Sequence, residues 1–512
     1  MTEEEIQQLR KENAELKEAL AQKDQRIEEL EGLLMRALLR IDEMERRLAK
    51  DSHNSSKPPS SDGLKHKPKR QQKKSKSSGG QAGHQGHTLQ QVETPDEVLT
   101  HRPEQCEACR RELREIGGQI KERRQVHELP ELRLRVIEHR VEAICCPACL
   151  HVTTARFPVG VDAPAQYGPK MQALAVYLSQ FQLLPMERIQ ELCVDLLGCQ
   201  LSEGTLTNWI AEAARTLGPS MLVLKRLLGW SQVNHVDETG ARIKGLLHWF
   251  HVTANQWLTF YAWHRKRGQE AMNEIGILPD YRGRLIHDRG LSYDGYSCEH
   301  SVCGAHLLRD CLWVAEHDQQ PWAQAMHDLL LCMLQTAEQW RARGAKAVPR
   351  AERDGLVVQY FELLQQGFAA HHQLALSPPK KQGRPKQSDA KNLLDALLKR
   401  AEQVLAFLDD LSVPFTNNLA ERDLRMLKVQ QKISGTFRSE KGATAFCVLR
   451  SYLSTMRKQG RSMLAALAAV FNGSPFPIAW EPGTCVVTNF SCRLSRGSFC
   501  AYLSMQSWNL LS

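Results

Sequence analysis

The sequence predicts a multidomain α+β protein, in which an α/β core is interrupted by an all-helical insertion and preceded by smaller modules. Three observations support this fold class. A heptad pattern runs through residues 3–49, and two Cys-x-x-Cys pairs follow within residues 95–155. Short apolar strands then appear within residues 230–310, and they give way to a long helical stretch over residues 311–410.

Residues 3–49 contain no proline and repeat apolar residues at heptad spacing. Eleven of the thirteen a and d positions are apolar: Ile6, Asn13, Leu20, Ile27, Leu34, Ile41 and Leu48 at a, and Leu9, Leu16, Lys23, Leu30, Ala37 and Met44 at d. This period predicts a coiled coil with a partner helix, and Asn13 at an a position is typical of two-stranded coils. We therefore expect self-association here; the alternative is one amphipathic helix packed on its own chain.

Residues 50–90 are rich in proline, glycine, serine and lysine, which predicts a disordered linker. Seven Lys, one Arg and a single acid lie between Lys57 and Lys76, in a chain whose net charge is +9. Such a tract attracts DNA phosphates through counterion release. The residues that we expect to contact DNA are Lys57, Lys67, Lys69, Arg70, Lys73 and Lys74.

The paired cysteines predict a structural zinc module over residues 95–155. Cys106-x-x-Cys109 and Cys146-x-x-Cys149 could each give two thiolates to a tetrahedral Zn²⁺. Cys145 and His151 are alternative ligands, and unliganded thiols are the other reading. The segment between the pairs contains a predicted strand over residues 132–139. Fifteen Cys without secretory features, and no apolar run of about 18 residues, predict reduced thiols in a cytosol and no membrane span.

Residues 165–220 have a helical pattern that fits a helix-turn-helix or an ordinary helical hairpin equally well. One helix is expected over residues 185–197 and ends at Gly198. Ser202 is a plausible N-cap for the next helix. In the helix-turn-helix interpretation, the outward positions that reach bases are Thr205, Thr207 and Asn208.

The α/β core begins with predicted strands at 233–236, 246–253, 257–262 and 284–287. Asp237 follows the first strand and Asp288 follows the fourth. Neighbouring strand ends would bring these carboxylates together, where they repel each other unless a cation lies between them. Mg²⁺ prefers oxygen ligands and therefore suits such a pair, although an Asp at a strand end is more often a turn or cap residue.

Glu421 lies at the start of a predicted helix in the last part of the core, residues 411–460. Arg425 and Lys428 share its helix face, so this carboxylate is placed to hold a metal while the cations hold phosphate. The tail over residues 475–512 contains no Lys and no clear period, and we expect an altered reading frame or a divergent extension there.

Several sequence blocks together resemble the transposases of insertion sequence 66 type, over about residues 5–475. These blocks are His53-Asn-Ser-Ser-Lys-Pro-Pro-Ser-Ser-Asp, Gly80-Gln-Ala-Gly-His-Gln-Gly-His87, Val236-Asp-Glu-Thr239, His287-Asp-Arg-Gly-Leu-Ser-Tyr293, Cys303-Gly-Ala-His306 and Asn417-Asn-Leu-Ala-Glu-Arg422. The resemblance implies a ribonuclease-H-like catalytic core of the acidic-triad (DDE) superfamily. It also implies a leucine-zipper-like coil, a zinc module, a helix-turn-helix and co-encoded accessory proteins.

The resemblance implies Asp237, Asp288 and Glu421 as the catalytic triad. Two Mg²⁺ or Mn²⁺ ions per site would activate the attacking oxygen and stabilise the leaving one. Cys303 and His306 match a Cys-x-x-His element near the site of related transposases, and we place them beside the second acid rather than among zinc ligands. Candidate contacts to backbone phosphates are Arg422, Arg425, Lys428 and Lys432.

These expectations describe a cytoplasmic, nucleoid-associated bacterial DNA transposase that binds transposon ends and target DNA and contacts no membrane. Metal-dependent cleavage at the transposon end would free a 3′-hydroxyl, which would then attack the target. Two alternatives use the same residues. A dimeric DNA-binding regulator would have lost catalysis, and a ribonuclease-H-like nuclease would cleave without strand transfer.

Overall fold

The computed structural model describes residues 3–50, 89–374 and 387–480. The basic residues predicted to contact DNA between Lys57 and Lys74 lie outside the described residues, as does most of the predicted tail. The chain divides into two compact units. The first contains Met1–His66, Arg156–Ile189 and Ser202–Ser512, and the second contains Lys67–Ala155 and Gln190–Leu201.

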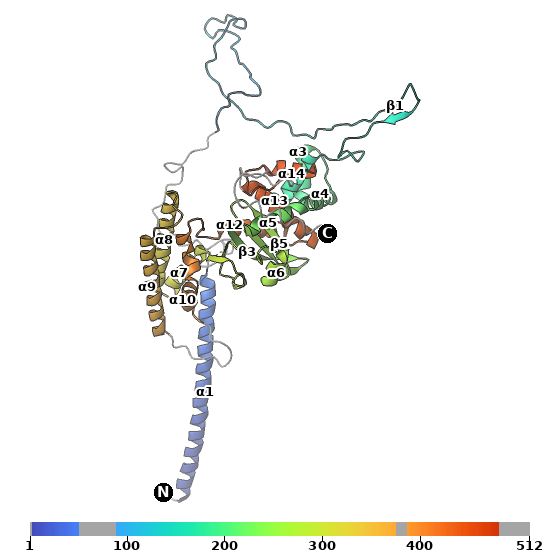
Figure 1. Cartoon of the computed structure of the whole chain (residues 1–512). Helices are drawn as coiled ribbons and strands as arrows, with labels where there is room; N and C mark the ends of the chain where they lie inside the picture. Colours follow the sequence, from blue (N-terminus) through green and yellow to red (C-terminus); the bar gives the residue numbers. More distant parts are fainter. Residues whose placement is uncertain (1–2, 51–88, 375–386, 481–512) are drawn as a thin grey trace. The chain divides into compact units, whose positions relative to one another are not determined.

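The first unit is built around a five-stranded sheet with the strand order β5-β4-β3-β6-β7. Figure 1 labels the strands β3 and β5 of this sheet. The strands are β3 (Val233–Ile243), β4 (Leu246–Ala254), β5 (Thr259–His264), β6 (Arg284–His287) and β7 (Glu299–Val302). The pairs β3–β4 and β4–β5 are antiparallel. The pairs β3–β6 and β6–β7 are parallel. The sheet is therefore a three-stranded meander extended by two parallel strands.

The prediction for the first strand was wrong at its end. A strand ending at Val236 was expected, but β3 continues to Ile243 and pairs with β4 along this whole length. The physical reason is a hairpin turn: Lys244 and Gly245 have φ values of 51° and 80°, the left-handed geometry of a two-residue turn. Asp237 therefore lies within an antiparallel hairpin, two residues beyond His235, where the parallel pairing with β6 ends.

Two further strand predictions differ from the structure. The third strand begins at Thr259 instead of Trp257, because the Asn255 side chain accepts the backbone N–H groups of Trp257 and Leu258 and forms a turn there. Strand β7 was not predicted. It is short, and it begins with the polar residues Glu299 and His300, so no apolar alternation marks it.

One face of the sheet is covered by α12 (Asn418–Ser434) and α13 (Glu440–Lys458). Their apolar residues pack against β3, β4 and β5 in one hydrophobic core. Phe250 is at the centre of this core and stacks on Phe437, with ring centroids 5.3 Å apart. Alternate residues of β3, among them Ala241 and Ile243, enter the core and therefore define the face that α12 covers.

The predicted helical insertion is present as five helices with a core of their own. They are α7 (Gly304–His317), α8 (Pro321–Ala342), α9 (Arg350–Leu374), α10 (Asp389–Lys399) and α11 (Ala401–Asp409). Chain residues 375–386, between α9 and α10, lie outside the described part. Buried residues of the sheet, Ile286 and Val302, belong to this same core, so the insertion packs directly on the parallel strands.

The remaining helices of the first unit surround the core. They are α2 (Pro169–Val176), the π-helical turn η2 (Tyr177–Phe181), α4 (Glu203–Thr216), α5 (Gly218–Gly229), α6 (Gln269–Ile275) and α14 (Met463–Phe471). The predicted helix over residues 185–197 is α3 (Met186–Leu197), and Gly198 follows it with φ 62°. The predicted cap is also present, because the Ser202 side chain accepts the backbone N–H of Thr205 at 3.0 Å.

The predicted N-terminal helix is α1 (Glu3–Ala49), a continuous helix of 47 residues. Its apolar heptad residues are open to solvent in the single chain: Leu20, Ile27 and Leu34 are 62%, 53% and 61% exposed. Near its end, Arg46 lies 3.6 Å from Asp318 of the insertion. No helix in the described ranges is both long enough and apolar enough to cross a bilayer.

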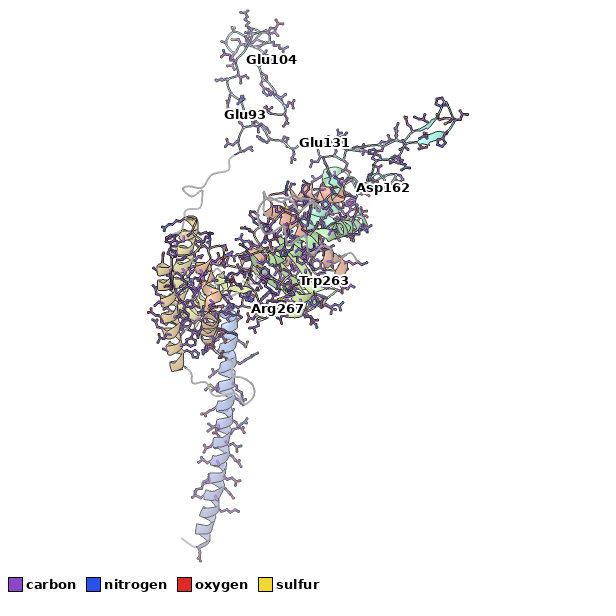
Figure 2. All side chains as sticks on the ribbon, viewed as in Figure 1. Glu93, Glu104, Glu131, Asp162, Trp263 and Arg267 are labelled. Carbon is purple, nitrogen blue, oxygen red and sulfur yellow. The ribbon has the colours of Figure 1, made fainter. Side chains whose placement is uncertain are left out.

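The second unit contains one small antiparallel pair, β1 (Ala143–Cys145) with β2 (Val152–Thr154). The strand predicted over residues 132–139 is absent. Val136 and Ile137 are 90% and 60% exposed, and no neighbouring strand accepts the backbone hydrogen bonds of this segment. Figure 2 labels Glu93, Glu104 and Glu131 along this extended chain.

Candidate active site

Asp237 and Asp288 lie at the same level on neighbouring parallel strands. His235 of β3 pairs with Ile286 of β6. Each aspartate lies two residues beyond one member of this pair. Because side chains alternate along a strand, both carboxylates lie on the same face of the sheet as His235 and Ile286. This is the face that α12 covers, and the predicted proximity of the two strand-borne acids is therefore present.

Glu421 lies in the first turn of α12, as predicted. Its backbone N–H donates to the carbonyl of Asn417, the residue that precedes the helix, at 3.2 Å. The carboxylate is half-buried and contributes to raising the pKa of Asp237. The positive end of the helix dipole favours an anion at this position. Three carboxylates from two strands and one helix therefore share one region of the sheet surface.

Asn417 holds the start of α12 against β3. It is fully buried. Its side-chain oxygen accepts from His235 Nδ1 at 3.1 Å, and its side-chain nitrogen donates to the carbonyl of Val236 at 2.8 Å. Both partners lie within two residues of Asp237. One amide side chain thus sets the position of the Glu421 helix relative to the strand that carries the first aspartate.

Cys303 and His306 lie beside Glu421. The Cys303 thiol donates to Glu421 Oε1 at 3.6 Å and accepts the backbone N–H of Asn417 at 3.1 Å. His306 Nδ1 lies 3.7 Å from the same Glu421 oxygen. Burial raises the pKa of Cys303 to about 11 and lowers that of His306. The prediction placed both residues near the second acid. Among the three acids, their closest polar contacts are with the third, and the charge of Asp288 also acts on His306.

The electrostatics of the site disfavour a second negative charge. Burial, then the nearby Asp288 and Glu238, raise the pKa of Asp237 to about 8. Oδ1 of Asp288 is buried and has no hydrogen-bond partner in the structure. A buried, unpartnered carboxylate oxygen beside a second carboxylate is a suitable site for a hard divalent cation. The residues present therefore fit the predicted Mg²⁺ or Mn²⁺.

The spacing of the acids bears on how many ions they could hold. A single ion needs several ligand atoms close together. Among the described residues, the one group of three or more His, Cys, Asp and Glu residues with ligand atoms within 4.8 Å of one another is Cys303, His306 and Glu421. The three triad carboxylates are consequently spread more widely than the ligands of a single ion. One ion held by all three carboxylates would therefore require their side chains to move closer together.

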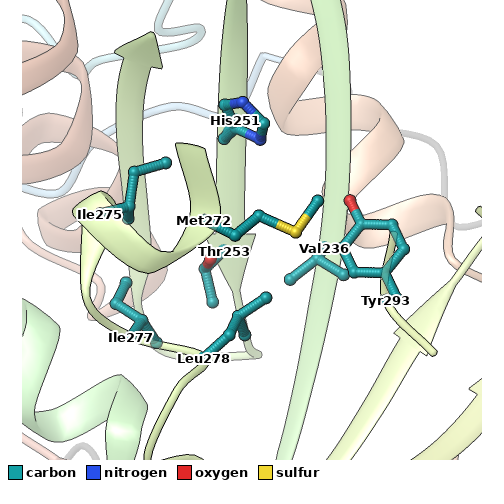
Figure 3. A pocket seen from close by; sticks show the side chains of 8 residues that line it. All are labelled: Val236, His251, Thr253, Met272, Ile275, Ile277, Leu278 and Tyr293. Atoms are coloured by element: carbon teal, nitrogen blue, oxygen red, sulfur yellow. The ribbon is translucent and has the colours of Figure 1, made fainter. Parts of the chain in front are cut away.

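Glu238 is a further buried acid, on the opposite face of β3 from Asp237. Its side chain is 3% exposed and accepts from Arg267 Nε at 2.9 Å. The hydroxyl of Tyr293 also donates to it. Tyr293, Val236 and Met272 line a small apolar pocket between the sheet and α6 (Figure 3), and Figure 2 labels Arg267. Arg267 and Tyr293 thus hold Glu238 on the face opposite the triad, while its charge still contributes to raising the pKa of Asp237.

The loop after Asp288 is held by the helical insertion. Arg289 has φ 67°, a conformation that residues other than glycine rarely adopt, and its guanidinium pairs with Asp310 of α7. Further along the loop, Asp294 accepts two hydrogen bonds from Arg400, at 2.9 and 2.7 Å. Arg400 is buried at the junction of α10 and α11. Two arginine–aspartate pairs therefore fix the segment that carries the second acid.

A second buried pair fixes α12 on the outer strand. Asp423 Oδ2 accepts from Lys458 Nζ at 2.9 Å and from the hydroxyl of Thr259 at 3.0 Å. The side chains of Asp423 and Lys458 are 18% and 17% exposed. The basic residues predicted to contact phosphate occupy the outer surface of the same helix, where Arg422, Arg425, Lys428 and Lys432 are exposed. Of these, Lys428 donates to the carbonyl of Gly240 at 2.7 Å.

The two predicted zinc knuckles have the same local geometry. Cys106 N–H donates to the carbonyl of Arg111, and Cys146 N–H donates to that of His151. In both turns the residue after the second cysteine, Arg110 or Leu150, has a positive φ near 60°. Backbone N–H groups lower the pKa of Cys106 and of Cys146, as suits metal-binding thiolates.

The structure does not bring the two knuckles into one cluster of ligand atoms. Among the described residues, no group of three sulfurs from Cys106, Cys109, Cys146 and Cys149 lies within 4.8 Å. Of the alternative ligands, Cys145 donates to the carbonyl of Leu150 at 3.4 Å. The four-thiolate zinc site therefore stays a prediction.

The residues predicted to reach bases lie on α4. Thr207 and Asn208 are exposed, whereas Thr205 is half-buried and its hydroxyl lies 2.9 Å from that of Ser202. The hydroxyl of Thr207 contacts the sulfur of Met186 at 3.9 Å. Two of the three predicted positions are therefore open to a ligand, and the third belongs to the N-cap.

Sequence reasoning missed the roles of Asn417 and Arg400. Asn417 was named only as the first residue of one sequence block, although two consecutive asparagines directly before the predicted helix were a visible signal. Arg400 lies in the middle of a helical stretch, and nothing in its local sequence distinguishes it from a solvated arginine. Its partner Asp294 is 106 positions away, so only the tertiary structure identifies the pair.

The fold and the site define a class of protein: a mixed sheet whose central parallel strands present two acids, completed by a third acid from a covering helix. Residues 164–445, more than half of the chain, match the family described as Transposase IS66 family. The chain belongs to this family, and its role is that of a transposase. Residues 2–90 match a family of unknown function. No curated protein matches the chain.

Replacing Asn417 by Ala should destabilise the catalytic core by roughly 2 to 4 kcal/mol, because His235 and the Val236 carbonyl lose buried hydrogen bonds. Chemical denaturation measures this loss. Asn418→Ala is the matched control, since Asn418 is the exposed neighbour and its loss should be near neutral. Equal midpoints for the two variants would contradict the role assigned to Asn417.

The raised pKa of Asp237 predicts how the stability of the metal-free protein depends on pH. Between its ordinary value of 3.8 and the value of about 8 in the fold, the folded chain keeps a proton that the unfolded chain loses. Stability should therefore fall as pH rises through this window. Asp237→Asn should weaken this slope, and Mg²⁺ should raise the melting temperature more at pH 8 than at pH 6. A slope unchanged by the substitution would refute this explanation.

Proposed function

We propose that this transposase cleaves DNA at transposon ends and joins the freed 3′ ends to target DNA, with Asp237, Asp288 and Glu421 as its catalytic acids. The observation that carries the proposal is the convergence of these three acids on one sheet face, inside a chain of the transposase family. The strand order, with a meander extended by two parallel strands, supports a ribonuclease-H-like core.

Asp237, Asp288 and Glu421 would hold two Mg²⁺ or Mn²⁺ ions. When bound, such ions supply Lewis-acid activation of the attacking oxygen and charge stabilisation of the leaving oxygen. The protein contributes the positions of the carboxylates. Asn417 fixes Glu421 relative to Asp237, and the Arg400–Asp294 pair fixes the loop after Asp288. The same arrangement serves hydrolysis and strand transfer, because only the nucleophile changes between them.

The exposed basic side chains of α12 are suited to the DNA backbone near the site. Arg422 and Arg425 lie three residues apart, so they project from neighbouring positions of one helix face. Both follow Glu421 within about one helical turn. Phosphates bound there would lie close to the third acid. Contacts of this kind position DNA and carry no base specificity.

Thr207 and Asn208 of α4 are the proposed base-contacting positions, within a helix-turn-helix formed by α3 and α4. The two cysteine knuckles are proposed to bind one structural Zn²⁺. Their matched turns support this, and binding would require them to approach each other.

We infer that α1 pairs with a second copy of the chain. Its described apolar a and d residues from Leu16 onward are exposed in the single chain, and a long apolar stripe of this kind is the signature of a coiled coil. Asn13 at an a position favours a two-stranded coil, because paired asparagines satisfy each other.

Removing any one triad carboxylate should lower the rates of cleavage and strand transfer by on the order of 10³-fold, since each holds a metal worth several kcal/mol to the transition state. The variants are Asp237→Asn, Asp288→Asn and Glu421→Gln, assayed with labelled end DNA and Mg²⁺. Asp280→Asn, an exposed acid just before β6, is the control and should retain activity. DNA binding should persist in all four.

The same assay separates the other functions. Cleavage without joining by the unaltered protein would indicate a nuclease, and DNA binding without cleavage would indicate a regulator. Full activity of Asp288→Asn would overturn the triad.

Glutamate substitution within the apolar stripe should dissociate the proposed pair. Leu20→Glu combined with Ile27→Glu places like charges at successive a positions, where each helix faces its partner. Sedimentation should then report a smaller assembly than for the unaltered chain. Gln22→Glu, at an outward position, is the control and should leave the assembly intact. An unchanged mass for the double variant would refute pairing through α1.

A further inference from the structure

We propose that Cys303, His306 and Glu421 form a second cation site, selective for a soft divalent ion of the zinc class, whose occupation withdraws Glu421 from the acidic triad. The inference rests on the proposed function in one respect only, namely that Glu421 is a catalytic acid. The cation site itself follows from the three side chains and their spacing.

The distances between the ligand atoms fit a tetrahedral ion. Zinc lies about 2.3 Å from sulfur and about 2.0–2.1 Å from nitrogen or oxygen, so tetrahedral ligand atoms are about 3.3–3.6 Å apart. Here Cys303 Sγ is 3.6 Å and His306 Nδ1 is 3.7 Å from the same Glu421 oxygen. The sulfur and the nitrogen are within 4.8 Å of each other. Only small side-chain movements are needed to enclose an ion.

The histidine nitrogen in this cluster lacks a hydrogen-bond partner. Nδ1 of His306 is buried and unpartnered in the structure, although it faces the Glu421 carboxylate. A buried polar atom without a partner costs free energy, which a metal–nitrogen bond would recover. This unpartnered nitrogen lies next to a thiol and a carboxylate. It is therefore independent evidence that the three side chains together bind a ligand.

Burial raises the pKa of the Cys303 thiol, but one backbone contact favours the thiolate that a metal would bind. Cys303 is the residue immediately before α7, and its sulfur accepts the backbone N–H of Asn417 at 3.1 Å. An N–H donor stabilises a thiolate more than a thiol. When the ion binds, the Cys303 proton is released to solvent and the sulfur becomes the ligand.

Ligand chemistry distinguishes this site from the triad. A thiolate and an imidazole select Zn²⁺ and related ions, whereas Mg²⁺ prefers a site of oxygen atoms alone. Three protein ligands leave a fourth tetrahedral position to water. Because Glu421 is the residue common to both sites, an ion bound beside Cys303 would draw the carboxylate away from Asp237 and Asp288. Zinc-class ions would therefore inhibit a magnesium-dependent reaction.

Cobalt binding tests the site directly. The full-length, metal-stripped protein should bind one equivalent of Co²⁺ more than the Cys303→Ser variant or the His306→Gln variant. This extra equivalent should show a thiolate-to-cobalt absorption band. Comparing whole chains cancels any ion held by the two cysteine knuckles. Cys332→Ser removes an exposed cysteine of α8 and should bind like the unaltered protein. Equal stoichiometry and equal spectra in all four proteins would overturn the site.

Inhibition tests the coupling to Glu421. In the Mg²⁺-dependent cleavage assay, Cys303→Ser should need at least about tenfold more Zn²⁺ for half-inhibition, because loss of a ligand weakens metal binding by at least the 10–100-fold seen for outer-shell partners. The inhibited rate is divided by the uninhibited rate of the same variant, so altered basal rates cancel. Equal sensitivity of the two proteins would refute the coupling.

The two proposals fail in different ways. If the unaltered protein shows no Mg²⁺-dependent cleavage, the proposed function fails, and the cobalt comparison still decides whether the site exists. If cleavage is normal but no extra equivalent of Co²⁺ binds, the cation site fails alone.

Discussion

The parallel pairing of β3 with β6 places two half-buried carboxylates at the same level, where their negative charges would repel each other. Burial and the nearby Asp288 both disfavour a negative charge on Asp237, and they raise its pKa to about 8. Other contacts around the acids hold the surrounding elements in place. Those contacts are neutral or oppositely charged pairs outside the triad, so the acids themselves remain available to a metal.

Three such contacts hold the three elements independently. Asn417 joins the Glu421 helix to β3, the Arg400–Asp294 pair joins the insertion to the Asp288 loop, and the Asp423–Lys458 pair joins α12 to the helix behind it. Each contact is at least partly buried, which strengthens its electrostatic attraction. The polar groups of each contact are paired with one another and not with the three acids. The positions of the three acids are thereby set by contacts that do not involve the acids themselves.

Sequence patterns reveal short-range features of this protein more readily than register. The N-cap at Ser202 and the limits of β6 depend on neighbouring residues, and both were predicted correctly. The continuation of β3 past Asp237 depends on its pairing with β4, and β7 exists because β6 offers an unpaired edge. Asn417 looks like a turn residue until His235, 182 positions earlier, is seen beside it. Long-range partners of this kind have no local signal.

The helical insertion between the second and third acids can be large without disturbing the site because its two ends are tied together. The chain leaves the sheet at Cys303 and returns at Phe415, where the Gly304 N–H donates to the Phe415 carbonyl at 2.8 Å. A Cβ at position 304 would lie 2.2 Å from the Phe415 ring, so only glycine permits this approach. Closure at this point brings the two ends of the insertion together, while the Arg400–Asp294 and Arg289–Asp310 pairs hold the Asp288 loop on the insertion.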